Sequence, residues 1–382
     1  MSNNHGVSSE FESLPAAVGS PPQHYGNPLG EQRELASGAA VVDLSHRGIL
    51  SVTGPDRLSW LDSLTSQSLA RLAPGESAET LQLDPNGHVE FAIRVIDDGE
   101  TAWLLVDEDE RMPLLAWLER MRFSLRVELA DRSAEFATIG SLGDVSVSPA
   151  APHGVPLVWR DPWQRVSPGG HQYSLAVEHP AASWSYSETL IERSRLGEAA
   201  ALPAAGLLAL EALRIAAWRP RFATEVDARS IPHELDWLRS AVHLAKGCYR
   251  GQETVAKVHN LGHPPRRLVL LHLDGSEGVL PEPGAPVLLG EATVGSVTSS
   301  AIHFELGPIA LAVIKRSVNA TATLVVLAGE VQASEESASE VPDVEAHASA
   351  TVISAAQEII VPTDAGAVAN VPRLPRLGAV KR

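Results

Sequence analysis

The densest set of reactive groups in the sequence lies at residues 246–253, which read Lys-Gly-Cys-Tyr-Arg-Gly-Gln-Glu. This stretch holds the only cysteine of the 382 residues, together with an ammonium, a guanidinium, a phenol, an amide and a carboxylate. A cysteine attacks or binds ligands as its thiolate, and neighbouring cations favour that form. Because Lys246 and Arg250 are each two residues from Cys248, we expect an activated thiol. The alternative is a small, buried apolar cysteine.

The charge distribution restricts the possible ligands. The formal net charge is −17. Since Lys and Arg bind the phosphates of nucleic acids, this charge argues against direct nucleic-acid binding. Residues 239–267 differ from the rest because they hold six Lys and Arg side chains against one acid, Glu253. This basic segment is either a solvated face or a site for an anionic ligand.

Cysteine content and hydropathy restrict the cellular setting. One cysteine cannot form an internal disulfide, and it cannot alone supply the four thiolates that usually hold an iron–sulfur cluster. No apolar run approaches the roughly 18 residues needed to cross a bilayer. Residues 1–27 lack the basic start and apolar centre of a secretion signal. We therefore expect a cytoplasmic protein without membrane contact.

The elements that must position residues 246–253 alternate strands and helices. The Asn-Gly pair at 86–87, between two strand-like runs, is a strong hairpin signal. Glu211 and Arg214 lie three residues apart on a predicted helix, where they can form an ion pair. The predicted strands are 41–45, 48–53, 79–83, 89–96 and 101–106. One predicted helix begins at Pro55, and two others span 114–121 and 204–218.

Composition and periodicity divide the chain into regions. Residues 1–27 show no sustained period and predict a disordered leader. Residues 28–265 mix predicted strands and helices, and the family resemblance described below implies that they form an α+β body of two interleaved lobes, the second at about 80–188. Residues 266–362 contain short strands that predict an antiparallel β-barrel, interrupted by an acidic insertion at 334–345. Residues 363–382 are predicted to be a tail.

A family resemblance appears in residues 246–253. Seven positions match the signature Lys-Gly-Cys-Tyr-x-Gly-Gln-Glu of the YgfZ family, folate-binding proteins related to the T-protein (aminomethyltransferase) of the glycine cleavage system. Residues 53–58, Thr-Gly-Pro-Asp-Arg-Leu, resemble the start of the T-protein folate-binding domain. Residues 294–300 resemble the C-terminal barrel of the family. The resemblance covers residues 28–362.

The resemblance implies a T-protein-like α+β fold of three domains that binds tetrahydrofolate or a one-carbon-substituted folate. It further implies a role in iron–sulfur cluster assembly or maintenance, and thereby in tRNA modification. The expected partners are a reduced folate and iron–sulfur enzymes or assembly proteins. The residues expected to react are Cys248, Lys246, Tyr249, Gln252 and Glu253. The residues expected to contact the folate are Glu90, Arg214, Glu234 and Arg250.

Two other functions remain open, and so does the question of enzymatic turnover. The first is a folate-dependent aminomethyl or one-carbon transferase, in which Glu90 would be the catalytic acid, although the paired aspartates typical of aminomethyltransferases are absent. The second is a non-catalytic scaffold with the same fold. Arg219 and Ala216 also depart from the pattern of many YgfZ relatives.

Overall fold

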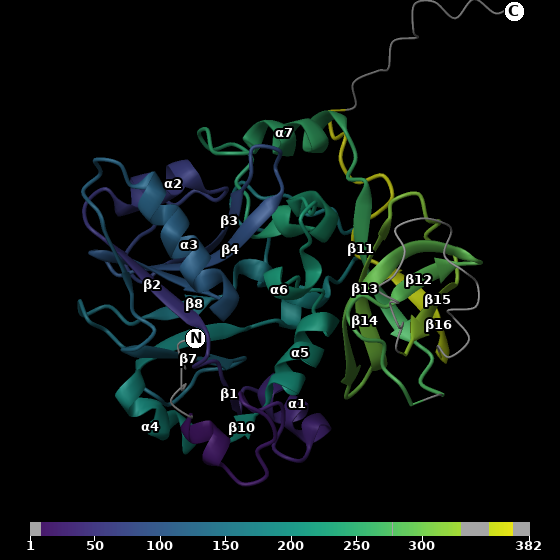
Figure 1. The fold of residues 1–382 in the computed structure, drawn as a ribbon, viewed down its shortest axis with the longest axis horizontal. Coiled ribbons are helices and arrows are strands. Elements are labelled where there is room, and N and C mark those ends of the chain that lie inside the picture. The colour runs from purple at the N-terminus through teal and green to yellow at the C-terminus, as the bar shows by residue number, and fades with distance from the viewer. Residues whose placement is uncertain (1–8, 277, 330–350, 370–382) are drawn as a thin grey trace, which may run out of the picture.

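The computed structural model describes residues 9–276, 278–329 and 351–369. Figure 1 shows two β-sheets that form one body, a closed β-barrel beside it, and helices between the two. The described part of the chain therefore has the predicted α+β architecture with a C-terminal antiparallel barrel. No helix in it is long and apolar enough to cross a membrane.

The first sheet is antiparallel, with strand order β3-β4-β5-β2-β6. The hairpin of β3 and β4 has the turn predicted at Asn86-Gly87, where Gly87 takes a φ of +85° that glycine tolerates. Apolar residues of two helices pack with those of β2 and β5. The elements are β2 (Gly48–Thr53), β3 (Ser77–Leu83), β4 (Val89–Asp97), β5 (Thr101–Val106), β6 (Glu128–Asp131), α2 (Arg57–Leu64) and α3 (Glu108–Met121).

The second sheet has strand order β10-β1-β7-β9-β8. The chain leaves this sheet after β1, forms the first sheet, and returns at β7, so the two sheets are interleaved in sequence. Its strands are β1 (Val41–Asp43), β7 (Phe136–Ser141), β8 (Val158–Arg160), β9 (Ser187–Glu192) and β10 (Ala204–Ala205). The helices around it are η1 (Glu10–Ser13), α1 (Pro28–Ala36), η2 (Pro162–Gln164), η3 (Pro180–Ser183), η4 (Arg193–Arg195) and α4 (Leu196–Ala200).

The barrel closes in the order β11-β14-β13-β12-β15-β16. Alternate residues of β11 face opposite sides, as strand geometry requires. Val269 and Leu271 pack inside the barrel. Leu268 and Leu270 belong to the largest core, which also contains residues of both sheets, so the barrel is packed on the body. The strands are β11 (Arg266–Leu273), β12 (Pro286–Leu289), β13 (Ala292–His303), β14 (Gly307–Lys315), β15 (Leu324–Ala328) and β16 (Thr351–Ile359).

Short helices connect the second sheet to the barrel. α5 and α6 lie between the sheets and the barrel, and α7 lies beside the tip of the β3–β4 hairpin (Figure 1). These helices are α5 (Leu207–Ala216), α6 (Phe222–Glu225), η5 (Pro232–Leu235), η6 (Trp237–Arg239) and α7 (Gln252–Leu261). Residues 246–253 thus lead directly into α7.

One expectation is wrong over the residues that the structure describes. Residues 9–27, expected to be part of a disordered leader, contain η1, whose Phe11 is completely buried against the second sheet. Leu14 and Tyr25 pack against the same core as Phe11. These three residues are spaced too irregularly to give a periodicity that a sequence pattern could reveal. The predicted insertion at 334–345 and most of the predicted tail lie outside the described residues.

Candidate functional site

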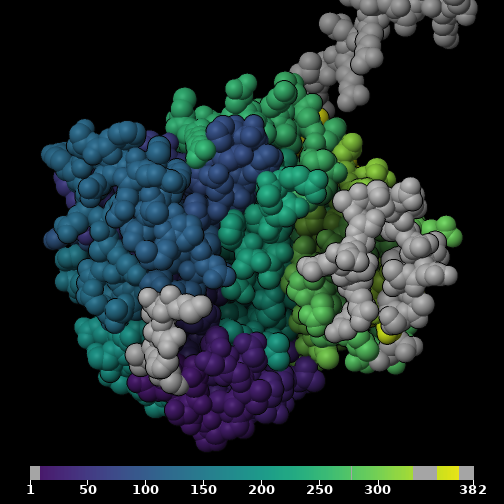
Figure 2. Space-filling view, viewed as in Figure 1, coloured from purple at the N-terminus to yellow at the C-terminus, as the bar shows by residue number. Residues whose placement is uncertain are grey.

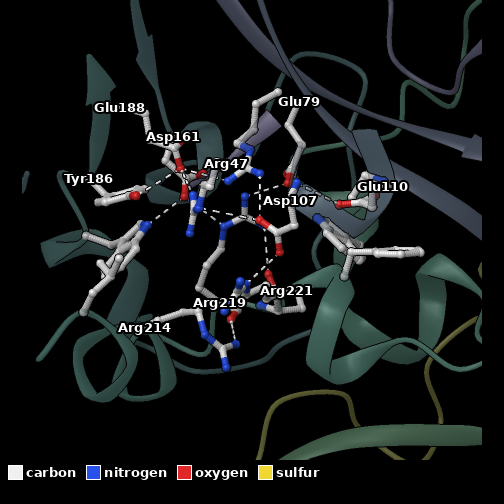
Figure 3. Close-up of a pocket in the computed structure, with 17 residues that line it drawn as sticks. Arg47, Glu79, Asp107, Glu110, Asp161, Tyr186, Glu188, Arg214, Arg219 and Arg221 are labelled. Carbon is white, nitrogen blue, oxygen red and sulfur yellow. Dashed lines mark hydrogen bonds and ion pairs between the residues drawn. The ribbon is translucent and has the colours of Figure 1, made fainter. Parts of the chain in front are cut away.

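A narrow cavity lies where the two sheets meet α5 and α6, and we call it the central cavity (Figure 3). Its volume is about 70 Å³. Charged side chains dominate its wall. They are the arginines Arg47, Arg94, Arg214, Arg219 and Arg221 and the carboxyl groups of Glu79, Asp107, Glu110, Asp161 and Glu188.

Glu188, on β9, is the most deeply buried of these acids. Its Oε1 accepts hydrogen bonds from Arg47, from Arg94 at 2.9 Å, and from the Tyr186 hydroxyl at 3.0 Å. Burial opposes its ionisation, but Arg94 and Arg47 outweigh burial and hold the pKa of Glu188 below its ordinary value. Its other oxygen, Oε2, is buried and has no hydrogen-bond partner among the residues that the structure describes. Glu188 therefore offers the cavity an unused acceptor.

Asp107, at the start of α3, joins three arginines. Arg94 donates to it at 3.1 Å and Arg221 at 2.9 Å, and the Arg47 Nε lies 3.6 Å away. Burial opposes ionisation, but these cations hold the pKa of Asp107 well below its usual range. The neighbouring Glu110 has no such partner, and burial together with Asp107 raises its pKa to about 7. The cavity thus contains one carboxyl group that titrates near neutral pH.

Arg219 forms a third charged group with acids from both sheet regions. Its Nη2 donates to Glu79 at 2.6 Å, and its Nε donates to Asp161 at 2.9 Å. The guanidinium also lies 5.3 Å from the ring centroid of Trp163 and 6.0 Å from that of Trp237. Cation–π contacts of this kind add to the attraction of the acids. Arg219, one of the two residues that depart from the YgfZ pattern, is therefore buried and joins the two sheet regions through its ion pairs.

Arg214 and Glu234, two of the residues predicted to contact the folate, instead form buried ion pairs and hydrogen bonds that hold the body and the barrel together. Arg214 pairs with Glu211, as predicted from their spacing, and also with Glu225 at 2.8 Å and with Ser299 of the barrel at 2.8 Å. Glu234 is completely buried, and both of its oxygens accept from Arg266 at the start of β11. Arg214 lines the central cavity, whereas Glu234 is not among the described residues that line it.

The other two predicted contacts meet near the hairpin. Glu90 accepts from Gln82 at 2.8 Å, and the Arg250 Nη1 lies 3.5 Å from the same carboxylate. Both side chains are more than a third exposed. Glu90 lies at a register shift of the β3–β4 pairing, between Val89, which pairs with Leu83, and Phe91, which pairs with Gln82, so strand alternation does not place it on the face of Ala92 and Arg94 that lines the cavity. Neither Glu90 nor Arg250 is among the described residues that line the cavity itself.

Residues 246–251, which we call the Cys248 loop, are held on the body by Lys246. Its ammonium is almost completely buried and donates to the backbone carbonyls of Asp62, Thr65 and Gln67. These carbonyls lie at the C-terminal end of α2, where a helix favours a cation. Lys246 was predicted to favour the thiolate of Cys248, but its ammonium instead binds the end of α2.

The remaining residues of the motif shape the loop. Gly251 has a φ of +82°, and a Cβ there would lie 2.6 Å from the Asp84 carbonyl oxygen and 3.0 Å from the Gly87 Cα. Gln252 donates to the Lys246 carbonyl at 3.2 Å. The Cys248 loop is thus pressed against the hairpin turn, and Figure 2 shows the hairpin in blue beside the green residues around α7.

The side chains of the motif have different surroundings. Cys248 is exposed, and Glu253 is exposed on the first turn of α7. Tyr249 is buried, and burial raises the pKa of its hydroxyl, which has no hydrogen-bond partner within the described part of the chain. None of residues 246–253 is among the described residues that line the central cavity. The structure therefore separates the thiol from the cavity.

Sequence reasoning missed most of the cavity residues. Arg47, Asp107, Asp161 and Glu188 belong to no motif, and they meet only because both sheets converge on α5 and α6. Arg94 did carry a signal, because it is a charged residue within the apolar strand 89–96. A charge in such a strand indicates either an exposed face or a buried partner, and here it has two buried partners.

The fold and the charged central cavity define the chain as a T-protein-like protein. Residues 21–147 match the family described as "GCVT N-terminal domain", and residues 266–342 match "Glycine cleavage T-protein C-terminal barrel domain". Together these regions cover more than half of the chain. The chain belongs to this aminomethyltransferase/T-protein-like family.

Individual relatives agree with this assignment. The aminomethyltransferase of Symbiobacterium thermophilum is 29% identical over 304 residues, which is 73% of this chain and 78% of the relative. That of Moorella thermoacetica is 27% identical over 82% of this chain and 87% of the relative. The crystal structure of the glycine cleavage system aminomethyltransferase T from Bartonella henselae matches with a TM-score of 0.66 and 14% identity, over 93% of this chain and 96% of that chain. This match shows the shared fold.

Proposed function

We propose that this chain is a YgfZ-like protein that binds a reduced folate in the central cavity and presents Cys248 to iron–sulfur enzymes or their assembly proteins. Its effect on tRNA modification would follow from the enzymes that it maintains. The observation that carries the folate part is the unpartnered Oε2 of Glu188. A buried acceptor without a partner is costly, and a ligand that donates an N–H group there would remove that cost.

The chemistry of the cavity suits a folate. A pterin ring has several N–H donors, which carboxylates accept, and aromatic faces, which Tyr186 and Trp237 can contact. The glutamyl part of a folate carries carboxylates, which arginine binds in a bidentate manner. Arg221 is suited to this role because its side chain is 34% exposed and lies at the edge of the cavity.

The volume of the cavity sets a condition on binding. At about 70 Å³, it is smaller than the roughly 300 Å³ at the lower end of known small-molecule pockets. A folate therefore fits only if side chains at the edge of the cavity move. Arg221 has one carboxylate partner, Asp107, whereas Arg47, Arg94 and Arg219 each have two. We expect Arg221 to move first.

Equilibrium binding tests the folate part. Calorimetric titration with tetrahydrofolate, methylene-tetrahydrofolate and formyl-tetrahydrofolate should give saturable binding, and the Glu188→Gln variant should bind at least tenfold more weakly. Glu192→Gln is the matched control, because Glu192 is exposed at the end of the same strand. No saturable binding at millimolar folate would refute the proposal and favour the scaffold function, which the paired arginines of the cavity would also suit.

The thiol part rests on the exposure of Cys248 and on the anchoring of its loop by Lys246. In cells that lack the endogenous protein, Cys248→Ala should fold and bind folate normally but fail to restore the activity of iron–sulfur enzymes. Glu253→Gln changes another exposed group of the same motif. Comparing the two variants shows whether the thiol or the carboxylate is needed to restore the enzymes. Full restoration by the Cys248→Ala variant would show that the thiol has no part in the function.

One-carbon transfer is the second candidate, because the relatives quoted above are named aminomethyltransferases and Glu90 lies on β4, the strand that also carries Arg94 of the cavity. A transfer assay with an aminomethyl donor and tetrahydrofolate separates the candidates. Turnover that is lost in Glu90→Gln but retained in Cys248→Ala would identify a transferase. The leading proposal expects no turnover above the rate without protein.

A further inference from the structure

A continuous set of buried hydrogen bonds joins the central cavity to the Cys248 loop. In the cavity wall, Arg219 Nη2 donates to Glu79 Oε1 at 2.6 Å. The other oxygen of Glu79, Oε2, accepts from the Ser240 hydroxyl at 2.7 Å. One carboxylate therefore has one oxygen bound to a residue of the cavity wall and the other bound to a residue outside it.

The connection continues from Ser240 to the loop. The Ser240 carbonyl accepts from Gln67 Nε2 at 2.9 Å, and the Gln67 carbonyl accepts from Lys246 Nζ at 2.7 Å. Lys246 begins the Cys248 loop, and Cys248 follows two residues later. We call this series, Arg219-Glu79-Ser240-Gln67-Lys246, the relay.

Every member of the relay is shielded from water. Arg219, Glu79, Ser240 and Gln67 are each at most 6% exposed, and the Lys246 side chain is 3% exposed. In such surroundings a displaced polar group cannot take a water molecule as a substitute partner, so its neighbours must move with it. A shift of Arg219 would therefore be passed to Lys246 rather than absorbed.

We propose that occupation of the central cavity controls how firmly the Cys248 loop is held, and thereby the reactivity of its exposed thiol, through this relay. The ligand is the one named under the proposed function, and the inference rests on that function for its identity. Arg219 lines the cavity, so without a ligand its side chain can move away from Glu79. A bound ligand fills that space, fixes Arg219 and Glu79, and thereby holds the Lys246 end of the loop on α2. The thiol would be least reactive when the ligand is bound.

The rate of alkylation of Cys248 by iodoacetamide measures this coupling, because it is the only cysteine in the chain. Saturating tetrahydrofolate should slow the reaction at least fivefold in the full-length wild-type protein, a typical size for coupling between two sites. Lys246→Met removes the loop end of the relay, so the effect of folate on the alkylation rate should disappear in that variant. An alkylation rate that saturating ligand does not change would refute the proposal.

Ser240→Ala breaks the relay at a residue that is not among the described residues lining the cavity, and Glu79 keeps its bond to Arg219. Folate affinity should remain within twofold of wild type, whereas the effect of folate on alkylation should disappear. Gln67→Met is a second variant that interrupts the same series at its next step. Ser66→Ala is the matched control, because Ser66 is equally buried and its hydroxyl also joins this segment to residue 241, at 2.6 Å, but it is not a member of the relay. The control should keep the full effect of folate.

A test without folate separates this inference from the proposed function. Arg219→Lys alters the cavity end of the relay directly, and it should change the alkylation rate in the wild-type background but not in the Ser240→Ala background. Such non-additivity would support the relay even if calorimetry detects no folate binding, in which case only the proposed ligand is wrong. Strictly additive effects of the two substitutions would refute the relay whatever the ligand.

Discussion

The central cavity and the Cys248 loop hold their cations in different ways. Each of the five arginines that line the cavity is paired with at least one carboxylate. In the loop, the ammonium of Lys246 is bound chiefly by backbone carbonyls at the end of α2. Paired side chains fix one another and can exchange partners when a ligand enters, whereas backbone carbonyls fix the position of the loop itself. The cavity is therefore suited to binding and the loop to presenting a residue.

The largest expected effect comes from breaking a charge group of the cavity. Arg219→Met leaves Glu79 and Asp161 without their shared cation, and should lower the free energy of unfolding by about 3–5 kcal/mol. Urea denaturation followed by tryptophan fluorescence measures this. Arg126→Met, which removes an exposed pair with Asp56, should leave the midpoint unchanged. Equal midpoints for both variants would contradict the view that the ion pairs in the wall of the cavity stabilise the folded protein.

The next effect concerns the backbone of the loop. Gly251→Ala places a Cβ 2.6 Å from a backbone oxygen at a φ of +82°, and should lower the free energy of unfolding by about 3 kcal/mol. Gly247→Ala is the control within the same motif, because a Cβ there meets nothing within 4 Å. Thermal unfolding of the two variants would show the difference. A destabilising Gly247→Ala and a neutral Gly251→Ala would reverse our description of the loop.

The third prediction separates the anchor of the loop from its charge. Lys246→Met removes the hydrogen bonds to α2 and should cost about 2 kcal/mol of unfolding free energy. It should also increase the rate of Cys248 alkylation, because the loop is released. If Lys246 instead activated the thiol directly, as its sequence position suggested, the same substitution would slow alkylation. Arg250→Met is the comparison variant, because it removes a partly exposed cation on the other side of Cys248 without removing the hydrogen bonds of Lys246 to α2.

The last effect appears only below neutral pH and concerns a residue that contacts α7. His233 is completely buried, and burial lowers its pKa to about 3. The folded state then binds fewer protons than the unfolded state between pH 6.5 and about 3, so stability falls as the pH decreases through this window, by about 1.4 kcal/mol per unit. His233→Gln keeps a donor for the Val255 carbonyl and should remove this slope.

Denaturation of the wild type and His233→Gln at pH 7, 6 and 5 gives the comparison. Asp236, whose pKa burial raises to about 7, produces an opposite slope between pH 3.8 and 7, but it is present in both proteins and cancels in their difference. A difference that is constant with pH would show that His233 can be protonated in the folded state.

The sequence predicted the local features of the molecule better than the long-range ones. The hairpin turn at Asn86-Gly87 and the Glu211–Arg214 pair depend on neighbours in the chain, and both are present. The partners of Arg219 are Glu79 and Asp161, 140 and 58 residues away, and no spacing rule relates them. Lys246 shows the same limit, because its partners at the end of α2 lie about 180 residues earlier.

The contact between α5, α6 and the barrel has a consequence for synthesis of the chain. Glu225 is buried between Arg214 and two residues of β13, Thr298 and Ser299. These barrel residues emerge from the ribosome about 75 residues after Glu225, which is a delay of roughly 4–15 s at ordinary rates of translation. During that time Glu225 and Arg214 lack part of their final surroundings. The cavity can therefore mature only after β13 has been made, so a nascent chain without its barrel should be a client for chaperones rather than a binder of ligand.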